Sequence, residues 1–551
     1  MFPSIRPSAL IPALCALAFT ATASLAQFSS DPGMQLEVGA NAGNMSKVRH
    51  HPMGYAVSWQ GGQFDGGNTL VQLLTHDGLP LLTAGGLQVT DAQLTSSFED
   101  YGFDVDAAGN LLVAFRDNST GSVEIRLQKI APDGSLPWGA NGVAVPGGPA
   151  GGDSPHTPGV TCLSDGAYAV KFSRGSTTST ATSRACYQKV SADGQLLWNG
   201  GQAVVLAPAS NGYIAADMAP GEDGSVLAFH YSIGSFTVSR RIVVQKLDGA
   251  SGAAVWNGGV SVPVQLTSTL QIGNFPQVLS DGSHGALVSW YETSNPLQCF
   301  VQRVGPDGSM LFPAGGATAT NGAVVGQQRV SPHVAFDANT QTTYMVYSET
   351  NSSQGASGIG AQAFDSTGNR LWGDAGVLVV PIGDTGHAST FARASLTQGG
   401  MIATWFETAA GGGPQVVNAA KLLADGQLAW SPTTLAVNTM GGTKARLDVV
   451  GSLGGPTVAA YGSNAGVLNI HASRINGDGT LGNPPPGCGT ADFDGDGDTG
   501  TDADIEAFFA CLAGNCCAAC YPGGADFNND GDTGTDADIE SFFRVLAGGD
   551  C

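Results

Sequence analysis

A short apolar phrase that ends in an aromatic residue recurs along most of this chain. The aromatic residues stand 56 to 61 positions apart and are Trp59, Phe115, Phe172, Phe229, Trp290, Tyr347, Trp405 and Tyr461. A second marker keeps the same register: a glycine with an aromatic residue or a leucine four positions later, first at Gly78 and last at Gly426. Two markers in register indicate eight tandem structural units.

The residues between the markers have the pattern of short strands joined by turns. In the unit at 275–326, the pairs Asp281-Gly282 and Asp307-Gly308 separate apolar runs, as tight hairpin turns do. Each unit therefore holds about four strands, and helical spacing of apolar residues is absent from this region. We expect an all-β fold over residues 27–482, an eight-bladed β-propeller that resembles no specific propeller family.

The repeated aromatic residues are expected to pack between blades rather than to contact a ligand. A residue type that recurs in every unit serves the packing of every unit, and a flat ring fills the wedge between neighbouring sheets. The eighth unit ends without the last strand of the others, whereas residues 33–38 near the N-terminus read as a strand. We expect this segment to complete the last blade, which removes two exposed sheet edges.

The N-terminus has the features of an export signal. Arg6 precedes an apolar run over residues 10–19, and small residues follow as far as Ala26. The pattern predicts a signal peptide over 1–26, and no apolar stretch reaches the length of a membrane span. A lipid anchor at Cys15 is disfavoured because no small residue directly precedes it. We expect a secreted protein, extracellular or associated with a cell surface.

The net charge of −23 is concentrated near the C-terminus, where residues 488–551 carry 12 Asp and 2 Glu against 1 Arg. Nucleic acid is excluded as a partner because binding its phosphates requires clusters of Lys and Arg. A proline-rich linker at 483–487 separates this acidic region from the repeats.

The acidic region contains one phrase twice, at 492–509 and 526–543. In each copy, acidic or amide residues alternate along the chain ahead of a glycine, as in loops that wrap side chains 1, 3 and 5 around a calcium ion and add a carbonyl from position 7. The residues in these positions are Asp492, Asp494, Asp496 and Asp498 in the first copy, and Asp526, Asn528, Asp530 and Asp532 in the second. The sequence predicts two calcium ions.

An amphipathic helix follows each loop. Apolar residues recur at helical spacing, namely Ile505, Phe508, Phe509 and Leu512, then Ile539, Phe542, Phe543 and Leu546. Thr501 and Asp504 have the spacing of a capping box. The two apolar faces are expected to pack on each other and form a core that neither helix has alone.

These residues resemble a dockerin, the duplicated loop-helix calcium module that binds cohesins, in its cysteine- and glycine-rich form, the GC-type dockerin. The resemblance covers residues 488–551 and implies an acidic ligand at the twelfth loop position, where this chain has Ala503. We expect a one-residue insertion, with Asp504 and Asp538 closing the two sites.

The dockerin resemblance also implies a protein partner for the acidic module. Dockerins often carry Ser-Thr just before the closing Asp, but this chain has Asp502-Ala503 and Asp536-Ala537 there. The expected partner is therefore a cohesin-like or other cell-surface protein.

Cysteines are used differently in the two regions. Six of them lie in the acidic module, at Cys488, Cys511, Cys516, Cys517, Cys520 and Cys551, which allows up to three disulfides and leaves their connectivity open. In the repeats, Cys162 and Cys186 are expected to lie on the first and third strands of one blade, too far apart to bridge.

No catalytic residue is assigned from the sequence. Glu292, Glu349 and Glu407 follow the blade aromatic residue in three units, and this repetition favours a position at a strand end. His50 and His51 lack a carboxylate or cysteine at metal-site spacing and are expected to be solvated or to line the channel.

The sequence favours a secreted, non-enzymatic binding or display protein whose propeller contacts a glycan or protein ligand. A secreted carbohydrate-active enzyme, a hydrolase or lyase with the same acidic module, is the alternative. Two buried carboxylates that face each other at the channel mouth would favour the enzyme, whereas a neutral or solvent-filled channel would favour the binding protein.

Overall fold

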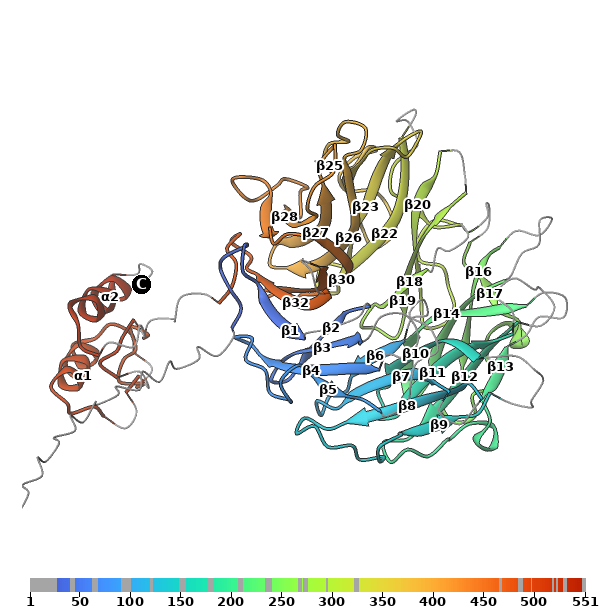
Figure 1. Cartoon of the computed structure of the whole chain (residues 1–551), viewed down its shortest axis with the longest axis horizontal. Coiled ribbons are helices and arrows are strands. Elements are labelled where there is room, and N and C mark those ends of the chain that lie inside the picture. Colours follow the sequence, from blue (N-terminus) through green and yellow to red (C-terminus); the bar gives the residue numbers. More distant parts are fainter. Residues whose placement is uncertain are drawn as a thin grey trace, which may run out of the picture.

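A computed structural model describes residues 27–39, 45–61, 68–90, 101–118, 122–147, 155–175, 183–206, 212–232, 240–265, 270, 276–293, 296–321, 327–464, 468–483, 489–496, 498–517, 520–521, 524–528 and 533–547. These residues form eight four-stranded antiparallel sheets arranged in a ring, with two α-helices in the C-terminal region (Figure 1). The predicted fold, an eight-bladed β-propeller, is confirmed. No described helix is long and apolar enough to cross a membrane.

The first four blades follow the chain order of their strands. They are β2 (Lys47–His51), β3 (Gly54–Gln60), β4 (Thr69–Thr75) and β5 (Leu87–Gln88); β6 (Gly102–Val105), β7 (Leu111–Asp117), β8 (Glu124–Ile130) and β9 (Val143–Val145); β10 (Pro155–Cys162), β11 (Tyr168–Arg174), β12 (Arg184–Val190) and β13 (Val204–Leu206); and β14 (Tyr213–Pro220), β15 (Val226–Ser232), β16 (Ile242–Leu247) and β17 (Val262–Pro263). Three short 3-10 turns, η1 (Asn199–Gly201), η2 (Glu222–Gly224) and η3 (Trp256–Gly259), lie in the third and fourth repeats.

The last four blades end with one that uses both ends of the propeller. They are β18 (Gln277–Ser280), β19 (Ala286–Glu292), β20 (Gln298–Val304) and β21 (Ala317–Thr318); β22 (Gln327–Asp337), β23 (Thr342–Asn351), β24 (Ser357–Phe364) and β25 (Val377–Val380); β26 (Ala388–Thr397), β27 (Gly400–Thr408), β28 (Val416–Leu423) and β29 (Leu435–Asn438); and β30 (Thr443–Val450), β31 (Thr457–Asn464) and β32 (Leu468–Ile475) with β1 (Leu36–Gly39).

The ring is closed by strand pairing between its two ends. β1 pairs antiparallel with β32, with Leu36 opposite Ala472 and Glu37 opposite His471. The first strand of each blade also contacts the first strands of both neighbouring blades, so β2 meets β30 as well as β6. These first strands therefore line the axis of the ring.

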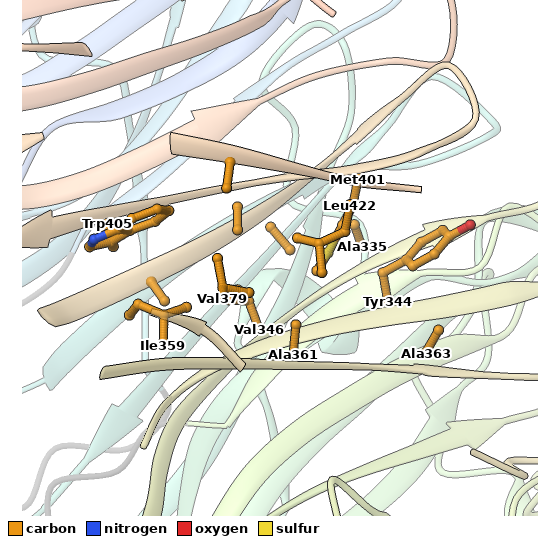
Figure 2. Packing of buried hydrophobic residues seen from close by; sticks show 14 of the residues in the cluster. Ala335, Tyr344, Val346, Ile359, Ala361, Ala363, Val379, Met401, Trp405 and Leu422 are labelled. Carbon is orange, nitrogen blue, oxygen red and sulfur yellow. The ribbon is translucent and has the colours of Figure 1, made fainter. Parts of the chain in front are cut away.

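Hydrophobic clusters fill the wedges between blades. Each of eight clusters draws its buried side chains from two neighbouring blades. Figure 2 shows the cluster between the sixth and seventh blades, where Val346 and Ile359 of one blade face Met401 and Trp405 of the other. All eight repeated aromatic residues are at most 1% exposed. Burying a large apolar side chain contributes roughly 1.5–3 kcal/mol, so these wedges supply much of the stability of the ring.

The second sequence marker joins each blade to the next one. The glycine of each marker has a positive φ, and from Gly134 to Gly479 the large side chain of the preceding marker lies against it. The pairs are Leu82 with Gly134, Trp138 with Gly194, Trp198 with Gly252, Trp256 with Gly308, Phe312 with Gly368, Trp372 with Gly426, and Trp430 with Gly479.

Several of these indoles also bond to the next blade. The Nε1 atoms of Trp198, Trp372 and Trp430 donate to backbone carbonyls 2.9–3.2 Å away on the turn that carries the partner glycine. Glycine is required there for two reasons: the φ is positive, and a Cβ would collide with the ring. We call this repeated contact the glycine seat.

The acidic module has its own small core. α1 (Asp502–Leu512) and α2 (Asp536–Leu546) pack through Phe508 and Phe542, whose rings stack with centroids 4.1 Å apart. The prediction that the two apolar faces meet is confirmed for these residues. The rings of Phe509 and Phe543 also meet across the two helices, with centroids 6.2 Å apart, but these residues are 44% and 45% exposed and so lie at the edge of the core.

Two disulfides link described cysteines of this module, Cys511–Cys516 and Cys517–Cys520. Cys488 and Cys551 lie outside the described residues. In the propeller, Cys162, Cys186 and Cys299 are free thiols, and Cys162 and Cys186 lie on β10 and β12 with β11 between them.

The glycine seat can be tested with two matched substitutions. Gly426 and Gly399 both have positive φ, at 86° and 76°, but a Cβ at Gly426 lies 2.9 Å from the Trp372 ring, whereas no atom lies within 4 Å of one at Gly399. G399A should cost about 1 kcal/mol for backbone strain, and G426A about 1–3 kcal/mol more because Trp372 must move. Chemical denaturation of both variants measures the difference, and equal losses would contradict the packing role of the seat.

Candidate functional site

The first acidic loop brings three carboxylates together. One carboxylate oxygen from each of Asp492, Asp494 and Asp504 lies within 4.8 Å of the other two. Asp504 belongs to the first turn of α1, and Thr501 and Asp504 form the predicted capping box. The Thr501 side chain accepts a hydrogen bond from the Asp504 N–H, and the Asp504 carboxylate accepts one from the Thr501 N–H. These two bonds fix the position of Asp504 next to the loop.

Asp504 also ties the loop to the helix. Its Oδ1 accepts hydrogen bonds from the backbone N–H groups of Phe493, at 2.6 Å, and Asp494, at 3.3 Å, and its Oδ2 accepts from the N–H and hydroxyl of Thr501. Burial raises the pKa of this carboxyl, but the hydrogen bonds from Thr501 and the loop outweigh burial and hold the pKa below its ordinary value. Asp504 is thus a fixed negative charge that is fully buried.

Asp492 supplies the feature that fits a cation. Its Oδ1 is buried and has no hydrogen-bond partner among the residues that the structure describes, although it lies beside two other carboxylates. A buried carboxylate oxygen without a donor is costly, and a hard cation bound by oxygen ligands satisfies it. The donor set of the three residues, all carboxylate oxygens, suits hard divalent cations as a class.

The remaining predicted ligands are placed less closely. Asp496 and Asp498 are exposed and lie outside the cluster of three. In the second copy, Asp538 is fully buried and accepts from the Asn528 N–H at 3.2 Å and from Thr535, as Asp504 does from its own loop. Asp526 is half-buried, and Asp530 and Asp532 lie outside the described residues.

A second candidate site lies on the axis of the propeller, on the first strands. In each blade, one residue of the first strand pairs with the second-strand residue that immediately precedes the repeated aromatic residue. We call the place of this first-strand residue the channel position. From the first blade to the eighth, the residues at this position are Lys47, Gly102, Gly159, Met218, Gln277, His333, Arg393 and Asp448.

Five of these channel positions line one pocket of about 200 Å³. The pocket is lined by Lys47, Gln277, His333, Arg393 and Asp448 together with Met45, Ser46, Arg49, Arg446 and Leu447. We call it the channel pocket. Among its lining residues are four side chains that carry a positive charge and one carboxylate.

The single carboxylate of the channel pocket is already paired. Asp448 Oδ2 accepts from Arg49 Nη1 and from the Val48 N–H, both at 3.0 Å. Burial raises the pKa of Asp448, but Arg49, the Val48 N–H and Arg393 outweigh this and lower it. Asp448 therefore stays ionised, and the pocket does not contain two facing carboxylates.

His333 is an uncharged hydrogen-bond donor in the same pocket. Its Nδ1 accepts from the Ala394 N–H at 3.1 Å, so the hydrogen of the neutral ring is on Nε2. Burial and the neighbouring Arg393 lower its pKa to about 3. His333 thus adds a neutral N–H donor to the pocket.

The glutamates at the strand ends bind neighbouring side chains, Glu349 and Glu407 within their own blades and Glu292 also across to the preceding blade. Glu292 accepts from the Trp290 indole at 3.0 Å and from Gln265, and Glu407 accepts from the Trp405 indole at 3.1 Å and from Asn418. Glu349 forms a 2.8 Å ion pair with Arg329, which is fully buried.

The two adjacent histidines lie outside the channel pocket. His51 is buried, and its ring nitrogens form hydrogen bonds with the Gly109 carbonyl oxygen and the Met53 N–H. His50 is exposed. His50 is therefore solvated, and His51 connects the first blade to the second.

Sequence reasoning missed Lys47, Arg49, His333, Arg393, Arg446 and Asp448. They are far apart along the chain and share no motif, and only the strand register brings them together. The sequence separation between a channel position and the repeated aromatic residue could have located these residues, but this separation changes by one or two residues between many neighbouring blades.

Comparisons with known proteins give only weak structural likenesses. No protein-family profile and no curated protein matches this chain. Among solved structures, a PL25 ulvan lyase is 10% identical, with a TM-score of 0.44 over 81% of this chain and 97% of its own. Polysaccharide lyase Uly1 is 10% identical, with a TM-score of 0.43 over 80% and 91%.

A third solved structure, the Hadza microbial sialidase Hz136, is 10% identical, with a TM-score of 0.35 over 74% of this chain and 73% of its own. These structural neighbours are carbohydrate-active enzymes, and the likeness to this chain is one of fold alone.

The structural role of Glu407 can be tested by its pH dependence. Burial raises its pKa, but hydrogen bonds from Trp405, Asn418 and His387 outweigh burial and lower it. A carboxyl whose folded pKa is below its unfolded value, about 4.3, stabilises the fold above that pH, and this stabilisation is lost on acidification. The Tm of E407Q should therefore lie below wild type near neutral pH, and the gap should close as pH falls. A gap independent of pH, or one equal to that of the exposed control D193N, would contradict this role.

Proposed function

We propose that this chain is an exported protein in two parts: a calcium-dependent, dockerin-like tail that attaches to a protein partner, and a propeller that the tail displays for binding. The observation that carries the proposal is the orphaned, buried Asp492 Oδ1 between Asp494 and Asp504. Three carboxylates held this closely repel one another, and a divalent cation converts the repulsion into attraction.

Duplication supports two ions rather than one. Asp504 and Asp538 close their loops with the same hydrogen bonds, one set to the loop backbone and one to the capping threonine. Because the helices pack through Phe508 and Phe542, calcium at either loop stabilises the core they share.

The exposed phenylalanines support a protein partner for the tail. Phe509 and Phe543 lie side by side on the two helices, with ring centroids 6.2 Å apart and almost half of each residue exposed. Solvent-exposed aromatic pairs are uncommon on isolated domains and common in binding interfaces. The two disulfides suit a module that works outside the cell.

A carbohydrate-active enzyme is the second candidate, and the channel pocket is the observation that favours it. Hydrolysis by two carboxylates does not fit the lining residues, because Asp448 is their one carboxylate. Elimination from an acidic polysaccharide fits better, because cations stabilise the negative charge that develops next to a sugar carboxylate. Incubation with acidic polysaccharides, with product read as reducing ends and as ultraviolet absorbance of unsaturated sugars, separates the two candidates. Chain cleavage lost in R393Q would favour the enzyme over the binding protein.

The calcium proposal is tested on the full chain. After EDTA treatment, calcium titration should give two binding events, a gain of helical circular dichroism and protection of the tail from protease. D492N should weaken binding at the first loop about tenfold or more, because affinity follows the number of charged ligands.

E506Q is the matched control for the calcium titration, since it removes one exposed carboxylate from α1 outside the loop. It should bind calcium as wild type does. Absence of calcium uptake by wild type, or equal weakening by D492N and E506Q, would contradict the proposal.

A further inference from the structure

The channel pocket is built by a repeated backbone device. A β-bulge interrupts the first strand of the third, sixth, seventh and eighth blades. The first unpaired residue of each bulge has a positive φ of 51° to 55°. These residues are Thr157, Ser331, Phe391 and Arg446. Met45 takes the same conformation two residues ahead of Lys47. None of these residues favours the left-handed region, so each bulge is strained.

The strained bulges aim side chains at the axis. The channel position follows the bulge directly in the last three blades, where its residues are His333, Arg393 and Asp448. Acceptor side chains at this position bond to the neighbouring blade: His333 accepts from Ala394 N–H, and Asp448 accepts from Val48 N–H. The guanidinium groups of Arg393 and Arg446 cannot accept hydrogen bonds from the neighbouring blade, so their positive charges are available to another partner.

The charges in the pocket are unequally satisfied. Lys47 donates to Tyr101 O at 2.7 Å and lies over the Tyr101 ring, and Arg49 is paired with Asp448, with Asp104 adding to the negative field at Arg49. Arg393 donates to Ala392 O, at 3.1 Å, but forms no ion pair with a described residue. Arg446 is exposed; its backbone carbonyl accepts from the Ser46 hydroxyl at 2.8 Å, but its guanidinium has no hydrogen bond or ion pair within the described part of the chain.

The like charges of the two arginines oppose each other. Burial and the nearby Arg446 lower the pKa of Arg393 even though Asp448 raises it. Keeping two guanidinium groups together, one of them half-buried, costs free energy that an anion between them would recover. This arrangement is maintained in a chain whose net charge is −23.

We propose that the channel pocket binds the carboxylate of an acidic sugar, with Arg393 and Arg446 as its charged partners. A guanidinium presents paired donors that match a carboxylate. The pocket volume of about 200 Å³ exceeds what a carboxylate alone fills, but is below the roughly 300–1,000 Å³ of sites for larger ligands. Gln277 and His333 offer amide and imidazole groups to sugar hydroxyls. The inference rests on the propeller alone and holds whether or not the tail binds calcium.

The test titrates the full chain with sodium D-glucuronate, followed by ligand-observed NMR, with D-glucose and acetate as controls. Glucuronate should bind, acetate should bind more weakly because it lacks the ring, and glucose should not bind measurably. Raising the salt concentration should weaken glucuronate binding. Glucose binding as tightly as glucuronate would overturn the role of charge, and acetate binding equally tightly would overturn the choice of a sugar.

Arg446→Gly separates binding from folding. Because glycine adopts a positive φ without strain, this variant should keep or raise the Tm while its affinity for glucuronate falls about tenfold. Asp448→Asn should change affinity in the opposite direction, because it removes the competing carboxylate and keeps an acceptor for the Val48 N–H.

Arg370→Gln is the matched control, since Arg370 pairs with Asp374 on an outer turn of the sixth blade, away from the pocket. Its affinity should equal that of wild type. Wild-type affinity in R446G, an equal loss in R370Q, or a joint fall of Tm and affinity in R446G would overturn the proposal.

Discussion

The seating of one blade's large side chain on the next blade's glycine is the constraint on which this structure depends. A four-stranded blade is too small to bury both of its faces, and a neighbour must cover each one. The seats around the ring, such as Trp372 on Gly426, set how closely two blades approach, and the wedge clusters then fill the space they leave. The N-terminal strand β1 completes the last blade and removes the free edges that an open array would expose.

Closure of the ring creates the channel, and strand register decides what lies in it. In five blades the residue at the channel position lines the channel pocket, so aromatic packing in the wedges and the chemistry of the pocket are linked through one backbone register. Bulges let the chain depart from that register locally, at the cost of strained residues such as Arg446. Strain retained at several blades around one pocket is what a binding site on a repetitive scaffold would require.

Much of the fold followed from the sequence because the packing contacts repeat. Trp405 and its equivalents recur since every wedge needs a flat ring, and Gly426 and its equivalents recur since every seat needs a residue without a side chain. The starts of the two C-terminal helices were equally predictable, because a threonine three residues ahead of an aspartate has the spacing of a capping box. The capping box of Thr501 and Asp504 appears in the structure as its spacing predicts.

The channel pocket was not predictable for a physical reason. Its cations come from the first, seventh and eighth blades and share no repeated position in the sequence. The positive-φ residues beside the pocket are Met45, Ser331, Phe391 and Arg446, residue types that give no sign of positive φ. The exposure of Phe509 was not predictable either, because an apolar residue at helical spacing can face a partner as well as a core.

The most direct test of the account is a crystal structure of the full chain grown with D-glucuronate. The account predicts that the carboxylate lies within hydrogen-bond distance of Arg393 and Arg446 inside a closed eight-bladed ring. A sugar bound elsewhere while the channel pocket holds only water would contradict it.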